Sequence, residues 1–173
     1  MLFLKIIVIG LLLLIFVQDI SSRSVYWFLF PGLAALFVLM HLSQHHLFTD
    51  TWQPVLINST FLILQFLIVS VYFSIKNRHW VNIADGLLGW GDMLFLLSIA
   101  FYLSVLNFLL FYIVSLIAVL LTWALWQGIS KEKNKQIPLA GLQAFIFTVF
   151  LATDWIKSFD LTNDTWLLNL IAK

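Results

Sequence analysis

Six long apolar stretches, separated by short polar connections, set the pattern of this chain. They cover about residues 2–17, 25–42, 54–75, 86–106, 108–128 and 137–155. Several come near the length of about twenty residues with which an apolar helix crosses a bilayer. The predicted fold is therefore all-α, a polytopic membrane protein with about six transmembrane helices. We expect one membrane domain over residues 1–156 and a short interfacial tail over 157–173, whose apolar part is too short to span.

The boundaries of the fourth stretch matter for the position of Asp92. Counted from Asp92, the stretch is short for a bilayer, whereas counted from Gly86 it is adequate. We therefore expect Asp92 just inside the membrane. A tight turn near Asn107 is predicted to separate this stretch from the fifth. Pro138 suits the first turn of the last helix, where its missing N–H is not needed.

The composition favours a membrane location and excludes several classes of function. Hydrophobic residues make up 62% of the chain and charged residues 10%, which is too little charge to cover a soluble domain of this length. The chain has no cysteine, and this excludes disulfides, Cys-ligated zinc and thiol nucleophiles. A net charge of +1 gives no reason to expect nucleic-acid binding. The partner predicted at this level is the lipid bilayer.

The distribution of Lys and Arg predicts which helix ends face the cytoplasm. With six crossings, the connections 18–24, 76–91 and 129–137 lie on one side of the membrane. That side carries most of the basic residues, namely Arg23, Lys76, Arg78, Lys131, Lys133 and Lys135. The other side carries Lys5, Lys157 and Lys173. By the positive-inside rule the first side is cytoplasmic, and we expect a multi-pass protein of the inner (cytoplasmic) membrane.

Two aspartates fall at similar depth on this cytoplasmic side. Asp19 ends the first helix as it arrives there, and Asp92 begins the fourth helix as it leaves. A carboxylate at the edge of the lipid is costly, so its default interpretation is functional. If the two helices are neighbours, the carboxyl groups can share a proton, activate water and polarise a peptide carbonyl. The alternative is two separate interfacial aspartates, each solvated or paired with Arg23 or Lys76.

The sequence just before Asp92 leaves room for another backbone. Gly86, Gly89 and Gly91 stand within six residues and contribute little side-chain bulk. Glycine at such positions allows a second chain, such as a substrate strand, to approach closely.

The opposite side of the membrane holds a group of histidines that suggests a metal site. His41 and His45 are four residues apart, as two ligands on one helical face would be, and His46 follows. Since only one carboxylate is near, an interfacial loop with ordinary histidines is preferred and no metal is predicted. Asp154 falls on this side too and is interpreted as an ordinary interfacial residue.

The segment Gly89–Asp92, which reads Gly-Trp-Gly-Asp, has the form of the GxGD motif. In this the chain resembles the peptidase domain of type IV prepilin peptidases and of the related preflagellin peptidases. Two further features agree with that family. Asp19, followed by Arg23 four residues later, ends the first helix, and a proline-containing stretch, Ile137–Gly141, opens the last one. The resemblance covers about residues 1–156.

This resemblance implies a membrane aspartic endopeptidase that cleaves the leader of prepilin-like precursors at the cytoplasmic membrane face. It implies that Asp19 and Asp92 are the catalytic pair. The candidate substrate-binding residues are Gly89 and Gly91, which would line the approach to the pair, Arg23, which would meet an acidic substrate residue, and Pro138 in the family-like stretch. The implied partner is a prepilin-like precursor protein, and no cofactor is needed.

The chain departs from the family pattern at two points. Leu94 stands two residues after the GxGD aspartate, where members often have a Lys. The cysteine-containing N-terminal region found in many bacterial members, which also N-methylate the new amino terminus, has no counterpart here, so we expect peptidase activity alone. Two alternatives stay open. One is a non-catalytic member of the same fold that acts as an assembly subunit, and the other is a small proton-coupled transporter that uses the same carboxylates.

Overall fold

The computed structural model describes residues 2–43, 48–77, 89–129, 138–157 and 160–171, and its regular structure is helical throughout. The helices are α1 (Leu2–Ser22), α2 (Leu29–Ser43), α3 (Phe48–Asn77), α4 (Trp90–Ile99), α5 (Val105–Ile129), α6 (Leu139–Lys157) and α7 (Thr165–Ile171). The first six correspond to the six apolar stretches, and α7 lies in the tail, whose apolar part is too short to span. The described part of the chain is all-α, as predicted.

Four of these helices are long and apolar enough to cross a membrane: α1, α6, Trp52–Lys76 within α3 and Val105–Trp126 within α5. The helices α2 and α4 are shorter, with 15 and 10 residues. At 1.5 Å per residue α4 measures only about 15 Å, which is half the thickness of the hydrocarbon layer. Within the described ranges the structure therefore supports a membrane protein with four candidate spans, and not six of full length. Residues 86–88, which the sequence adds to the fourth span, lie outside those ranges.

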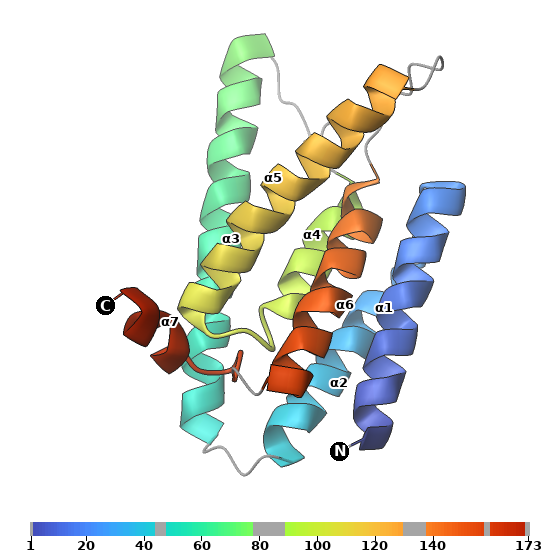
Figure 1. Cartoon of the computed structure of the whole chain (residues 1–173). Coiled ribbons are helices and arrows are strands. Elements are labelled where there is room, and N and C mark those ends of the chain that lie inside the picture. Colours follow the sequence, from blue (N-terminus) through green and yellow to red (C-terminus); the bar gives the residue numbers. More distant parts are fainter. Residues whose placement is uncertain (1, 44–47, 78–88, 130–137, 158–159, 172–173) are drawn as a thin grey trace.

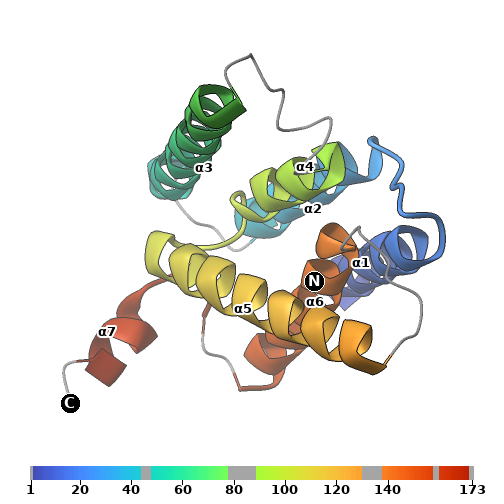
Figure 2. The ribbon, with the colours of Figure 1, turned by 90° about the horizontal axis from the view of Figure 1, so that it is seen from above.

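The helices alternate in direction through a bundle (Figures 1 and 2). Helix α1 packs most extensively on α6, and α2 lies beside α4. Helix α5 crosses obliquely past α6, and α3 stands at the edge of the bundle, beside α4 and α5. As a result, the C-terminal ends of α1, α3 and α5 and the N-terminal ends of α4 and α6 lie toward the upper end of the bundle in Figure 1.

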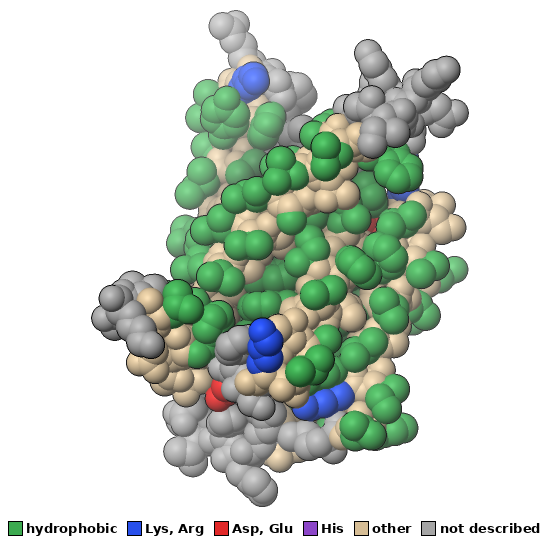
Figure 3. Space-filling view, in the orientation of Figure 1, with side chains coloured by type: hydrophobic (Ala, Val, Ile, Leu, Met, Phe, Trp, Pro, Cys, Tyr) green, Lys and Arg blue, Asp and Glu red, His purple; other side chains and the backbone are tan. Residues whose placement is uncertain are grey.

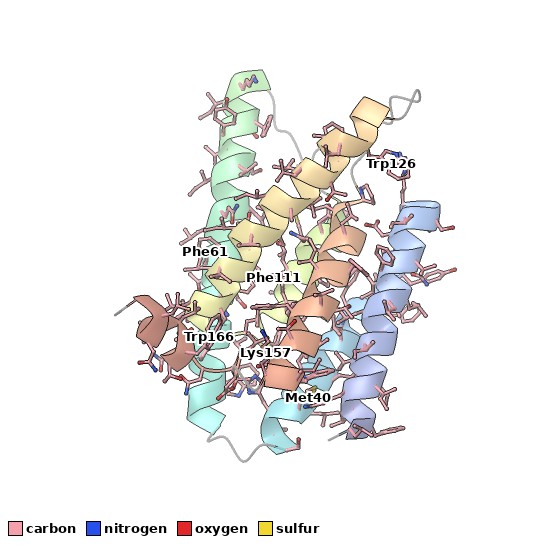
Figure 4. All side chains as sticks on the ribbon, viewed as in Figure 1. Met40, Phe61, Phe111, Trp126, Lys157 and Trp166 are labelled. Atoms are coloured by element: carbon pink, nitrogen blue, oxygen red, sulfur yellow. The ribbon has the colours of Figure 1, made fainter. Side chains whose placement is uncertain are left out.

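Phe147 of α6 is the centre of the core. Its fully buried ring makes edge-to-face contacts with Phe37, Phe95 and Phe111, at centroid distances of 5.9, 6.4 and 5.1 Å. Tyr102 is a fourth neighbour, at 6.5 Å. These rings come from α2, α4, α5 and the connection between α4 and α5, and Figure 4 labels Phe111 between α5 and α6. Such pairs add to the stabilisation that their buried area provides, so one side chain of α6 joins the surrounding elements.

The outside of the bundle is apolar. Large hydrophobic side chains on α3 and α5, among them Ile63, Ile68, Leu121 and Leu125, are more than half exposed. Figure 3 shows hydrophobic side chains over the flank of the bundle, with the charged ones toward its two ends. In water an apolar surface of this extent would promote aggregation, whereas lipid tails are as apolar as these side chains. The exposed surface therefore supports a membrane location.

At the end of the bundle where α7 lies (Figure 1), the segment after α6 is fixed to the start of α5. The fully buried Asn107 donates from Nδ2 to Ser104 Oγ (2.8 Å), Leu161 O (3.2 Å) and Asn163 O (3.0 Å). Ser104 Oγ in turn donates to Asp164 Oδ1 at 2.5 Å. This network of side chains and carbonyl groups anchors the tail to the body of the protein.

The sequence prediction placed the turn between the fourth and fifth helices too late. Helix α4 ends at Ile99 and α5 begins at Val105, so the turn occupies residues 100–104. Asn107 lies in the first turn of α5, where its amide group binds the tail instead of making the turn.

Replacing Asn107 with Ala removes the hydrogen bonds from its side chain to Ser104, Leu161 and Asn163, while Leu161 O keeps the Ser104 amide as a donor. Since a net hydrogen bond contributes about 1 kcal/mol, we expect Asn107→Ala to lower the free energy of unfolding by about 2–3 kcal/mol, measured by denaturant unfolding in detergent. The control is Thr122→Ala on an exposed part of α5, which should change it by less than about 0.5 kcal/mol. Equal stability of the two variants would contradict an anchoring role for Asn107.

Candidate active site

The structure brings Asp19 and Asp92 to the same end of the bundle. Asp19 lies in the last turn of α1 and Asp92 in the first turn of α4, and both helix ends lie toward the upper end in Figure 1. The side chain of Asp19 is buried and that of Asp92 is half-buried. The charge of Asp19 acts on the carboxyl group of Asp92. Helices α1 and α4 are thus close enough for the two acids to form a pair.

The N-terminus of α6 holds this pair through its main chain. The amide of Ala140 donates to Asp92 Oδ1 at 2.8 Å, and the next amide, of Gly141, donates to Asp19 Oδ2 at 2.6 Å. The first N–H groups of a helix have no partner within the helix, and the helix dipole makes this end attractive for negative charge. Two consecutive amides of one helix therefore place two carboxylates side by side.

Asp92 also stabilises the start of its own helix. Its Oδ2 accepts from the Gly89 amide at 3.1 Å, while the Asp92 amide donates to Gly89 O at 3.0 Å. This reciprocal pair satisfies groups that a helix N-terminus leaves free. Each oxygen of Asp92 thus accepts one backbone N–H, one from α6 and one from the residue before α4, which fixes the orientation of the carboxylate.

Gly141 allows α6 to approach α1 this closely. A Cβ atom at position 141 would lie 2.8 Å from Asp19 Cβ, 3.0 Å from Asp19 Oδ2 and 3.2 Å from Phe16 O. Contacts under 3.0 Å do not occur for a real Cβ, so any side chain at Gly141 would push the helices apart. Gly141 is thus the glycine, within the described chain, at which two helices pack too closely for a side chain, while the approach of a substrate strand to Gly89 and Gly91 stays a prediction.

The two glycines of the motif have more room. A Cβ at Gly91 would meet Phe30 Cζ at 3.6 Å, an ordinary contact, and one at Gly89 would meet Asp92 Oδ2 at 3.3 Å. Gly89 is exposed and Gly91 is half-buried. These positions lie beside the carboxylates, where an approaching chain would meet little side-chain bulk.

Arg23 is the basic residue whose charge acts on Asp19. Its amide donates to Asp19 O at 2.9 Å, and its φ of 52° ends α1 in the left-handed conformation that glycine adopts more easily. Its side chain is exposed. Lys76, the other candidate cation, lies in the last turn of α3, whose main neighbours are α4 and α5.

Pro138 comes directly before α6. It is half-buried, and its carbonyl oxygen accepts from the Leu142 amide at 3.2 Å. It thus sets the position from which the Ala140 and Gly141 amides point at the two acids. The role of these two amides could not be derived from side-chain chemistry. The signal that marks them in the sequence is the Ile137–Gly141 stretch.

The other predicted residues lie elsewhere. His41 is buried, and its Nε2 is 3.2 Å from Tyr102 O, while His45 and His46 lie outside the described residues. Within those residues no three His, Cys, Asp or Glu side chains come together as a metal site.

Asp154 is buried, with 7% of its surface exposed, which the sequence did not predict, while its interpretation as an ordinary interfacial residue stays a prediction. The charge of Lys5 acts on the Asp154 carboxylate, and the Lys5 Nζ lies 4.8 Å from the ring centroid of Trp155. These contacts tie the N-terminal part of α1 to the C-terminal part of α6, at the opposite end of the helix pair from Asp19 and Gly141.

Comparison of the chain with protein-family models, with curated protein sequences and with solved structures gives no match. The geometry of the site and the motif are therefore the basis for any functional conclusion.

The contact at Gly141 leads to a test of the site's construction. Adding one methyl group in Gly141→Ala forces α1 and α6 apart, and we expect the free energy of unfolding in detergent to fall by about 1–3 kcal/mol. The matched control is Gly10→Ala within α1, where a Cβ meets nothing within 4 Å. There the change should raise the free energy of unfolding by up to about 1 kcal/mol, because alanine favours the helix. Similar effects at both positions would contradict the close approach.

Proposed function

We propose that this protein is a membrane aspartic endopeptidase that cleaves the leader of prepilin-like precursors, with Asp19 and Asp92 as its catalytic pair. The single observation that carries the proposal is the meeting of these two acids, which are far apart along the chain, on consecutive amides at one helix N-terminus. The GxGD form of Gly89–Asp92 adds the substrate class by resemblance. No metal and no cofactor takes part.

The pair supplies both functions that peptide hydrolysis requires. Two carboxyl groups this close cannot both ionise at low cost, so they hold one proton between them. The ionised member removes a proton from water, and the protonated member polarises the carbonyl of the scissile peptide. Within the described chain, N–H donors occupy both oxygens of Asp92 but only Oδ2 of Asp19. Asp19 Oδ1 is therefore the natural carrier of the shared proton.

The substrate segment is expected to lie among the helices with its scissile peptide unwound. A helical peptide bond is protected by its own hydrogen bonds, so unwinding is needed before attack. Gly89 and Gly91 border the approach to the pair, and Pro138 and Arg23 flank it. In the proposed arrangement α1 to α6 are the membrane domain, with α2 and α4 as short crossings. The site then faces the cytoplasm, in the inner membrane.

The proposal predicts that each carboxylate is indispensable. Co-expressed with a prepilin-like precursor, the wild type should remove the leader, whereas Asp19→Asn and Asp92→Asn should each reduce removal below detection, since an amide cannot share the proton. Leader removal is followed by immunoblotting of the precursor. The control is Asp160→Asn, because Asp160 is exposed and lies near α7. This variant should remove the leader at the wild-type rate.

The rival functions give different results in the same experiment. Processing that persists in both Asn variants would exclude the paired-acid mechanism. A non-catalytic assembly subunit would leave the precursor uncleaved in the wild type as well. A proton-coupled transporter would show flux that depends on the carboxylates and no processing.

Substitutions at Gly91 test the approach of the substrate. A methyl group fits at ordinary contact distance from Phe30, so Gly91→Ala should cleave at nearly the wild-type rate. The larger side chain in Gly91→Leu has to occupy the space beside Asp92, and we expect the rate of leader removal to fall about tenfold or more. Membrane insertion and expression of both variants are measured as controls. A rate in Gly91→Leu equal to that in Gly91→Ala would contradict a substrate path along this face.

A further inference from the structure

Gln143 is a fully buried polar side chain on α6, one turn beyond the amide that binds Asp92. Its Nε2 donates to Ser115 Oγ of α5 at 3.2 Å, and Ser115 Oγ donates to Tyr112 O at 3.2 Å. The amide oxygen of Gln143 has no hydrogen-bond partner within the described chain. Because the Ser115 hydroxyl gives its proton to Tyr112, it can only accept from Gln143. The nitrogen of Gln143 therefore faces Ser115, and the oxygen stays unpaired.

This oxygen lies between the aromatic core and the candidate active site. Along the interface of α5 and α6, Phe111 meets Phe147 in one layer, at 5.1 Å, and Ser115 meets Gln143 in the next. Figure 4 labels Phe111 at this interface. One turn further toward the start of α6 is Ala140, whose amide binds Asp92. The unpaired acceptor thus belongs to a residue one helical turn from Ala140, on the side of α6 that faces α5.

An unpaired amide oxygen in an apolar bundle is unfavourable, and an aliphatic side chain would fill the same space without that penalty. Violations of this kind concentrate at functional sites. An unwound peptide among membrane helices has the complementary need, because its N–H groups have lost their helical acceptors. The missing donor for Gln143 and the missing acceptor for the substrate match each other chemically.

We propose that Gln143 Oε1 accepts a hydrogen bond from a backbone N–H of the unwound substrate, which makes Gln143 a substrate-positioning residue; this rests on the proposed function. Gln143 follows Ala140 by three residues, which corresponds to about 4.5 Å along the helix axis. An extended strand advances about 3.3 Å per residue. The N–H that Gln143 binds therefore belongs to a residue one or two positions from the scissile peptide, on the side that enters the bundle.

The substrate reaches Gln143 by separating α5 from α6. Helix α6 packs much more extensively on α1 than on α5, and α5 crosses it obliquely (Figures 1 and 2). The contact of α6 with α5 is thus weaker than its contact with α1. Opening it exposes Gln143 while the amides of Ala140 and Gly141 stay on the two acids.

The test measures binding apart from cleavage. Asp92→Asn, which cannot cleave, is compared with the double variant Asp92→Asn/Gln143→Met for binding of a fluorescently labelled prepilin-like precursor peptide in detergent micelles. Methionine keeps the length of glutamine and removes both polar atoms. Because one hydrogen bond is lost, we expect the Kd of the double variant to be about threefold to tenfold higher than that of Asp92→Asn. In the cleaving protein, Gln143→Met should raise KM by about the same factor and leave kcat nearly unchanged.

A merely structural role for Gln143 gives different readouts. If its bond to Ser115 only stabilises the bundle, Gln143→Met lowers the unfolding temperature and leaves Kd unchanged, and this result overturns the inference. The matched control is Gln65→Leu on α3, which removes another half-buried glutamine whose amide oxygen is unpaired; its Kd should equal that of the parent.

Failure of this inference is distinguishable from failure of the proposed function. Equal Kd values for the single and double Asp92→Asn variants overturn the role of Gln143, while the wild type still removes the leader. Absence of leader removal by the wild type overturns the proposed function itself. A weaker Kd together with an unchanged or higher unfolding temperature supports the inference, because only a binding group is lost.

Discussion

The structure depends on one contact, in which two neighbouring backbone amides at the start of α6 bind two carboxylates from α1 and α4. A helix N-terminus has unpaired donors and a positive dipole, and the paired acids have excess negative charge. Each side satisfies the other where little water is available to do so. Removal of α6 from this position would take away the donor to Asp19 and one of the two donors to Asp92, so the docking of three helices is linked to the ionisation of the pair.

The rest of the bundle supports this contact from a distance. Phe147 connects α6 with the helices around it through edge-to-face rings, and Lys5 beside Trp155 and Asp154 fixes the far end of the α1–α6 pair. With α1 and α6 held at both ends, Gly141 and Asp19 keep their relative positions along the helix axes. The tail bound to Asn107 closes the opposite end of the molecule.

The sequence predicts much of this arrangement, and the reasons for the remainder are physical. The lengths of the apolar stretches predict the helices. Counting the crossings then places Asp19 and Asp92 at the same end of the bundle without any structural information. Counting apolar stretches does not show that α2 and α4 are short. An apolar stretch can continue through a turn, as it does at residues 100–104, where the helix ends. The count also does not show that Asp154 is buried, since burial depends on which helix packs against that residue. The roles of Ala140 and Gly141 cannot be read from side-chain chemistry, because their main-chain N–H groups make the bonds.

That the acids are held by the main chain bears on how this protein can evolve. Every residue except proline supplies the same N–H, so position 140 can change its side chain within the limits of packing and still bind Asp92. Position 141 adds only a limit on size. A lineage could therefore change the side chain at position 140 and keep the contact between α6 and the two acids, provided that position 141 stays small.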